Sequence, residues 1–179
     1  MVMAVYVEKT VSSDKIFSGK ILNLRVDTVE MPDGSTATRE IVEHHGAVAV
    51  AAVDAEGMIY LVRQYRKPVE EVLLEIPAGK LEIGEDAVEC AHRELLEETG
   101  LKAESLEKVF TYYTTPGFTT EAIHIFVASG LTQYEAQPDE DEFLDLVKLP
   151  LDEAYAMIRS GEIKDGKSIV ALQHLKLIR

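Results

Sequence analysis

The chain has 179 residues, of which 46% are hydrophobic and 28% are charged, and its formal net charge is −14. This composition is typical of one globular domain with a small extension. The acidic excess disfavours binding to DNA or RNA, whose phosphates are normally contacted by clustered Lys and Arg. The longest apolar run, residues 47–53, is too short to span a membrane.

Alternating apolar and polar residues predict strands through the first half of the chain. Two such runs, 21–31 and 36–44, flank the turn sequence "PDG". A second hairpin is predicted around "DAEG", and its first strand should be buried on both faces. The strands of this second hairpin and the short strand that follows it are predicted at 46–53, 58–65 and 71–77.

A loop over 78–86 leads into a predicted helix from about Asp86 to Thr99, with Gly100 as its left-handed cap. Two strands around a loop, an acidic loop, a further strand and two helices complete the chain. These segments are 108–113, 121–129, 135–142, 143–149, 151–162 and 168–178. The order of elements predicts an α/β (α+β) sandwich with a mixed sheet.

The helix over 86–99 places Glu94, Glu97 and Glu98 on one face, where like charges repel each other. Small residues, Cys90 among them, precede these glutamates on the same face, and no lysine does. A solvated acidic face is the simplest explanation. The open space and the carboxylates also suit hard divalent cations, which could clamp phosphate oxygens and activate water.

The spacing around this helix resembles the Nudix box, GX5EX7REUXEEXGU, in which U is apolar. Gly79 and Glu85 stand at the required distances before "RELLEETGL", residues 93–101. A chance match at all fixed positions is on the order of one in a hundred million. The resemblance implies a Nudix α/β/α sandwich that hydrolyses nucleoside diphosphates linked to another moiety, with Mg2+ or Mn2+ as cofactor.

The resemblance also implies roles for individual residues. Glu94 and Glu98 correspond to metal ligands, Glu97 to an additional ligand, and the backbone carbonyl of Ala78 to a further one. Arg93 would orient the glutamates through ion pairs. Glycines 79 and 100 would give the backbone freedom, and Glu85 would brace the loop.

Further segments resemble the ADP-ribose pyrophosphatase branch of this family. They are "VRQYRKPV", "LEIPAGK", "TTPGFTTE", which contains Pro116, and "DEDEF". In that branch Arg66 would contact the substrate's diphosphate or terminal ribose, while Arg39 and Glu40 would lie near the adenine. The resemblance also implies a homodimer with shared sites. A small antiparallel N-terminal β-sheet over 1–45 would form the dimer, and the hydrolase domain over 46–179 would follow it.

Two parts of the site are less closely defined. The general base should come from the acidic loop, where Glu142 is favoured and Glu140 is the second choice; a solvated loop is the alternative. The chain has no Trp to stack on a base. Ile21 stands near the place of such an aromatic residue, and Tyr6 or Phe17 could substitute for it.

We therefore expect Mg2+-dependent hydrolysis of ADP-ribose to AMP and ribose 5-phosphate. Another nucleotide sugar, FAD or a dinucleoside polyphosphate is the alternative substrate. A non-catalytic ADP-ribose sensor is disfavoured, because the box keeps all its glutamates. The first residues show no signal peptide, and a single cysteine fits a reducing cytoplasm. We expect no nucleic-acid or membrane partner.

Overall fold

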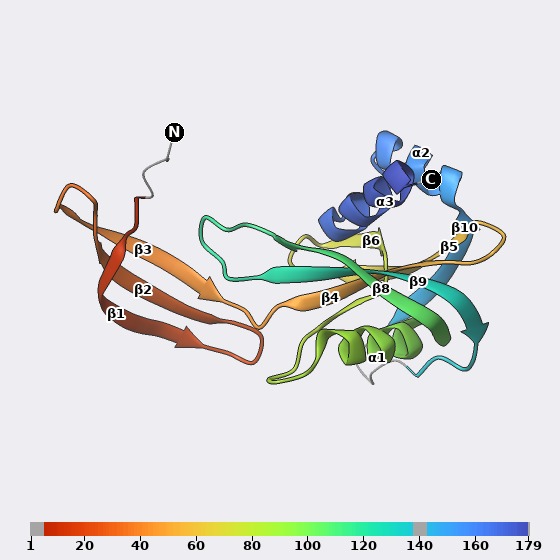
Figure 1. Cartoon of the computed structure of the whole chain (residues 1–179), viewed down its shortest axis with the longest axis horizontal. Helices are drawn as coiled ribbons and strands as arrows, with labels where there is room; N and C mark the ends of the chain where they lie inside the picture. Colours follow the sequence, from red (N-terminus) through yellow and green to blue (C-terminus); the bar gives the residue numbers. More distant parts are fainter. Residues whose placement is uncertain (1–5, 138–142, 179) are drawn as a thin grey trace. The chain divides into compact units, whose positions relative to one another are not determined.

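The computed structural model describes residues 6–137 and 143–178. The chain divides into two compact units. The first comprises Met1–Gly46 and Tyr113–Ala122, and the second comprises Ala47–Tyr112 and Ile123–Arg179. Figure 1 shows the helices and the larger sheet in the second unit.

The first unit is built on a three-stranded antiparallel sheet in the order β1-β2-β3. Its strands are β1 (Lys9–Ser18), β2 (Asn23–Glu30) and β3 (Thr36–Glu43). The predicted turn between β2 and β3 is confirmed: Gly34 has a φ of 83°, and the Asp33 carboxylate accepts the Ser35 N–H at 2.9 Å. Strand β1 was not predicted. All of its residues are exposed, so its sequence lacks the alternation of apolar and polar residues that a half-buried strand shows.

The second unit holds a sheet in the order β10-β5-β4-β9-β8, with β6 paired to β5 and β7 paired to β4. Strands β4 and β9 run parallel, whereas β5 is antiparallel to β4, β6 and β10. The predicted mixed sheet is therefore confirmed. Its strands are β4 (Ala47–Val53), β5 (Met58–Arg66), β6 (Glu71–Glu75), β7 (Ala78–Lys80), β8 (Leu101–Tyr113), β9 (Ala122–Gln133) and β10 (Leu144–Pro150).

Helices cover both faces of this sheet, as predicted for the sandwich. Figure 1 shows α1 (Ala87–Thr99) on one face and α2 (Leu151–Ser160) and α3 (Gly166–Ile178) on the other. Strand β4 contributes to both cores, as its uninterrupted apolar sequence predicts. Val48 and Val50 belong to the cluster that contains α1, and Ala49 and Ala51 to the cluster that contains α2 and α3.

The segment predicted as a loop before α1 contains the short strand β7. Its three residues pair with Ala47, Val48 and Ala49 of β4. This pairing fixes the backbone of the segment beside the buried strand, so it is less free than a loop. A strand of three residues is too short to show periodicity in the sequence.

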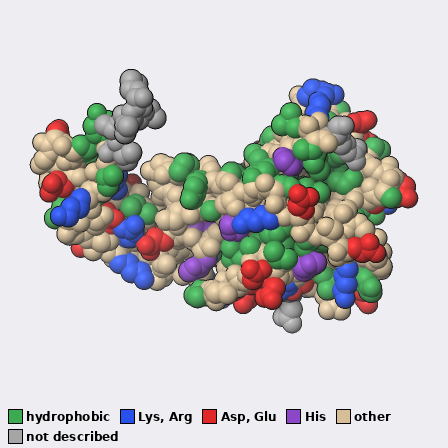
Figure 2. Space-filling model, viewed as in Figure 1, with side chains coloured by type: hydrophobic (Ala, Val, Ile, Leu, Met, Phe, Trp, Pro, Cys, Tyr) green, Lys and Arg blue, Asp and Glu red, His purple; other side chains and the backbone are tan. Residues whose placement is uncertain are grey.

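The surface carries charges of both signs. Figure 2 shows acidic and basic side chains interspersed on the face in view. Within the described ranges, no helix is both long and apolar enough to cross a membrane.

Candidate active site

Helix α1 has a well-defined cap at each end, and its predicted limits are confirmed. The Asp86 carboxylate accepts the N–H of Val88 at 2.8 Å, which satisfies one of the amides left open at the helix start. At the other end Gly100 has a φ of 70°, and its N–H donates to the Leu96 carbonyl. A Cβ on Gly100 would also lie 2.4 Å from the Tyr134 carbonyl oxygen.

One guanidinium connects the helix to the preceding loop. Arg93 donates from Nε and Nη2 to the two carboxylate oxygens of Glu85, at 3.0 and 3.1 Å. Its Nη1 donates to Glu94 at 2.8 Å and to Glu97 at 3.0 Å. These contacts hold Glu85 against the helix, as its predicted bracing role requires. Arg93 is also in place to orient Glu94 and Glu97, although their catalytic roles stay predictions.

These ion pairs change the acidity of the groups involved. The hydrogen bonds with Glu85, and after them the charge of Glu94, raise the pKa of Arg93 although burial opposes this. The hydrogen bonds from Arg93 lower the pKa of Glu85 from 4.5 to about 2. Glu85 should therefore stabilise the fold while it is ionised.

We expect Glu85→Gln to lower the free energy of unfolding by about 1–2 kcal/mol at pH 7, since a hydrogen-bonded ion pair is lost. The folded-state pKa of Glu85, about 2, lies below the ordinary 4.5, so its contribution is complete above pH 4.5 and is lost as the pH falls towards 2. Urea unfolding of both proteins at pH 7, 4 and 3 measures this. A difference that stays constant over that range would contradict the assignment.

Gly79 of β7 faces the carboxylate of Glu94. A Cβ at this position would lie 1.8 Å from both Cδ and Oε1 of Glu94. The predicted need for backbone freedom does not explain why a glycine stands at position 79, because the φ of Gly79 is not positive. It is needed because β7 approaches the carboxylate so closely that no side chain fits between them.

The neighbouring residue contacts a second carboxylate. The N–H of Ala78 donates to Oε2 of Glu98 at 3.1 Å. Glu98 and Glu94 are only 6% and 8% exposed. Burying a carboxylate is costly unless it is compensated by hydrogen bonds or a cation. Strand β7 and Arg93 supply part of this compensation, and a bound metal ion would add to it.

Among residues 6–137 and 143–178, no three Asp, Glu, His or Cys side chains form a ready-made group of metal ligands. Two of the box glutamates contact Arg93 and the third contacts the backbone of β7. A metal ion would therefore compete with Arg93 for Glu94 and Glu97. The donors that the glutamates and the backbone of β7 offer are all oxygen atoms, so the site suits a hard divalent ion.

Arg66 lies at the end of β5 and is paired within the second unit. Its Nε and Nη2 each donate to a carboxylate oxygen of Glu75, at 2.8 Å. Glu75 is 1% exposed and also accepts a hydrogen bond from Lys167. Neither partner was predicted. An acid inside the apolar run "VLLEIP" was the available signal for Glu75.

The other predicted substrate residues belong to the first unit. Arg39 on β3 donates to both carboxylate oxygens of Glu8, at 2.8 and 2.5 Å, and Glu40 is exposed. The residues considered for stacking on a base are all exposed: Tyr6, Phe17 and Ile21. Both candidates for the general base, Glu142 and Glu140, lie outside the described residues.

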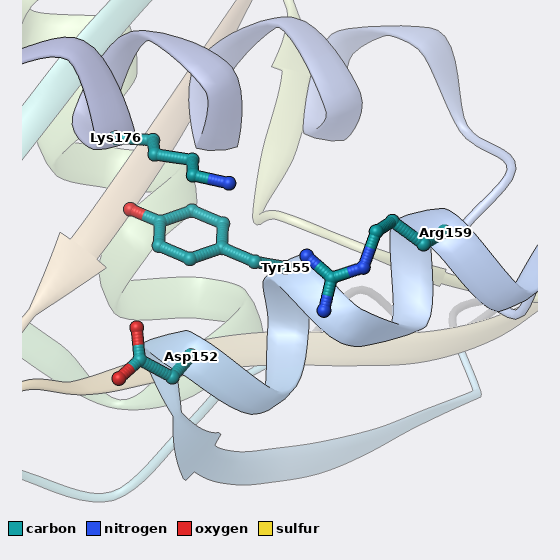
Figure 3. A pocket seen from close by; sticks show the side chains of 4 residues that line it. All are labelled: Asp152, Tyr155, Arg159 and Lys176. Carbon is teal, nitrogen blue, oxygen red and sulfur yellow. The ribbon is translucent and has the colours of Figure 1, made fainter.

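A separate cavity of about 330 Å³ lies at helices α2 and α3. Figure 3 shows Asp152, Tyr155 and Arg159 of α2 and Lys176 of α3 around it. The Lys176 ammonium lies over the Tyr155 ring, at 5.3 Å from its centroid. None of these side chains is a predicted site residue, so the cavity does not help to define the active site.

Two family models match the chain consecutively. The NUDIX domain matches residues 43–172, and the nucleoside diphosphate sugar hydrolase N-terminal domain matches residues 8–42. The first match covers most of the chain. The chain therefore belongs to the Nudix family, as its box predicts, and it is a Nudix hydrolase.

The chain is also similar to named relatives and to a solved structure. The chain is 52% identical to the methanol dehydrogenase activator of Bacillus methanolicus and 48% identical to the ADP-ribose pyrophosphatase of Bacillus subtilis. Each match covers 95% of this chain and 93% of the relative. A crystal structure of an ADP compounds hydrolase, at 22% identity, has the same fold, with a TM-score of 0.85 over 98% of this chain and 95% of that one.

Proposed function

We propose that this protein hydrolyses ADP-ribose to AMP and ribose 5-phosphate in a reaction that depends on Mg2+. The observation that carries the proposal is the packing of Glu94 and Glu98 against β7, which Gly79 makes possible. It gathers buried carboxylates where a divalent ion and a diphosphate could meet. The 48% identity to an ADP-ribose pyrophosphatase supports the choice of substrate.

Glu94, Glu97, Glu98 and the carbonyl of Ala78 would hold the metal. When bound, Mg2+ would offset the charge of the diphosphate and make a water molecule more acidic. The water oxygen forms a bond to one phosphorus atom, and the bond from that phosphorus to the bridging oxygen breaks. Glu142 accepts the proton of the attacking water.

Arg93 would act on the glutamates that hold the metal, whereas Arg66 would act on the substrate. Arg93 keeps Glu94 and Glu97 on the same side of α1 through its ion pairs with both. Arg66 would donate hydrogen bonds to the diphosphate, for which the planar guanidinium is suited. Its ion pair with Glu75 uses Nε and Nη2, and a guanidinium has further N–H donors.

We also propose that residues 1–45 form a dimerisation subdomain and that the site is shared between two copies. Every residue of β1 is exposed, and Val11, Ile16 and Phe17 are more than half exposed. A second copy could cover these apolar side chains. Arg39 and Glu40 would then lie near the adenine in the partner's site. The division of the chain into a dimerisation subdomain over 1–45 and a hydrolase domain over 46–179 is part of this proposal.

A substrate panel tests the proposal directly. ADP-ribose, GDP-mannose, FAD and diadenosine polyphosphates are incubated with the protein and Mg2+, and nucleoside monophosphate release is measured. We expect the highest kcat/KM for ADP-ribose, and no release when EDTA removes the metal. A higher kcat/KM for another member of the panel would change the proposed substrate but not the proposed reaction, which is hydrolysis of a diphosphate. Binding of ADP-ribose without release of AMP would indicate a sensor.

The 52% identity to a methanol dehydrogenase activator favours a second candidate function, stimulation of a dehydrogenase. The two functions are compatible, because an activator could act by hydrolysing a nucleotide. Methanol dehydrogenase activity measured with this protein and with its Glu98→Gln variant separates the possibilities. Stimulation that survives the substitution would indicate an effect of binding rather than hydrolysis.

A further inference from the structure

A buried carboxylate connects Arg66 to the C-terminal helix. Glu75, at the end of β6, accepts hydrogen bonds from Arg66 on both oxygens and from Lys167 of α3 on Oε2. The Lys167 side chain is only 11% exposed. Burial alone would raise the pKa of Glu75, but the hydrogen bonds from Arg66 and the charge of Lys167 lower it. Glu75 therefore stays ionised between two cations.

Lys167 is itself held by the start of α3. Its ammonium contacts Oδ1 of Asp165 at 3.0 Å, and Oδ2 of Asp165 accepts the N–H and the hydroxyl of Ser168, at 2.9 and 2.6 Å. Ser168 is fully buried, and its oxygen accepts the N–H of Ile76 at 2.8 Å. The first turn of α3 therefore contacts the side chain of Glu75 through Lys167, and it contacts the backbone N–H of the next residue, Ile76, through Ser168.

These contacts form a chain of ion pairs in the same unit as α1. Arg66, Glu75, Lys167 and Asp165 alternate in charge, and each contacts the next. Glu75 and Ile76 lie just before Pro77 and the β7 residues that contact Glu94 and Glu98. A displacement of the first turn of α3 would therefore also displace the guanidinium of Arg66 and the backbone of β7.

We infer that Lys167 is a positioning residue for substrate binding, which acts through Glu75 to fix the guanidinium of Arg66 for the diphosphate. The inference rests on the proposed function, because it assumes that Arg66 contacts the substrate. Lys167 occupies one oxygen of Glu75 from the side of α3. Glu75 then presents a fixed pair of acceptors to Nε and Nη2 of Arg66, and a fixed guanidinium loses less conformational entropy on binding.

Lys167→Met tests the inference, because it removes the ammonium and keeps most of the apolar stem. We expect the Kd for ADP-ribose, measured by calorimetry in EDTA, and the KM with Mg2+ to rise about tenfold. The kcat should change less than threefold, because the acidic helix is untouched. Lys167→Arg should restore part of the affinity, since a guanidinium can still donate to Glu75.

Lys164→Met is the matched control. Lys164 makes a similar ion pair with Glu71 at the other end of β6, at 2.6 Å, but both side chains are at least half exposed. Its loss should leave Kd, KM and kcat unchanged. Arg66→Ala provides the second control: in that background, adding Lys167→Met should weaken binding by less than twofold further, because the path through Arg66 is already broken.

Should Lys167→Met fail to fold, the double variant Glu75→Gln with Lys167→Met removes both charges and is expected to fold and to show the same weaker binding. A folded Lys167→Met variant that binds ADP-ribose as tightly as the wild type overturns the inference alone. So does an undiminished loss of affinity in the Arg66→Ala background. A wild-type protein that neither binds nor hydrolyses ADP-ribose overturns the proposed function and this inference together.

Discussion

A Glu98→Gln variant is expected to lose kcat by about 10³-fold or more, the scale found when one electrostatic contributor is removed from an active site. Glu98 is 6% exposed, and it accepts the Ala78 N–H. A glutamine has nearly the same shape, and its side-chain carbonyl can accept the same hydrogen bond. The substitution therefore removes a negative charge needed for a divalent ion while the contact with β7 remains.

Stability should respond differently from activity in this variant. Because a buried charge is removed without leaving a cavity, we expect Tm to stay the same or to rise. Glu89→Gln is the matched control, since Glu89 is an exposed glutamate in the first turn of the same helix. It should keep normal kcat. Near-normal turnover by Glu98→Gln at saturating Mg2+ would refute the assignment of Glu98 as a metal ligand.

The second large effect is expected for Gly79→Ala. The added methyl group would lie 1.8 Å from the carboxyl carbon of Glu94, so Glu94 or β7 must move. A displacement of about 1 Å in a catalytic group can cost about 100-fold in rate, and overpacking costs about 1–3 kcal/mol of stability. Steady-state kinetics and urea unfolding should show both losses.

Two companion variants show whether space is the cause. Gly166→Ala adds the same methyl group where no atom lies within 4 Å and φ is not positive, so kcat should be unchanged. Adding Glu94→Asp to Gly79→Ala shortens the displaced side chain by one methylene. Stability should then partly recover while activity stays low, because the carboxylate is withdrawn. Full activity in Gly79→Ala alone would show that the close approach has no catalytic role.

Local signals explain why helix α1 could be predicted so closely. Asp86 and Gly100 are residues of the types that begin and end helices, and both adopt the expected cap geometry. The spacing from Gly79 to Gly100 also identifies the family, because it fixes many residue types at once. The ion pairs of Arg93 follow from this spacing, since Glu97 lies one turn away and Glu85 stands at the end of the loop.

Contacts between distant segments could not be predicted in the same way. Gly79 was interpreted through its backbone freedom, whereas its surroundings show that the carboxylate of Glu94 leaves no space for a side chain. The partnership of Glu75 with Lys167 spans 92 residues, and neither residue carries a local signal for the other. Strand β1 was missed because its exposed residues lack the alternation that burial imposes.

The most direct test of the proposed function is the product balance of one reaction. ADP-ribose is incubated with the protein and Mg2+, and AMP and ribose 5-phosphate are quantified together by mass spectrometry in water enriched in oxygen-18. Hydrolysis at the diphosphate predicts equal amounts of the two products, one labelled oxygen for each bond broken, and neither product in EDTA. Tight binding of ADP-ribose without AMP, or AMP release that EDTA does not affect, would contradict it.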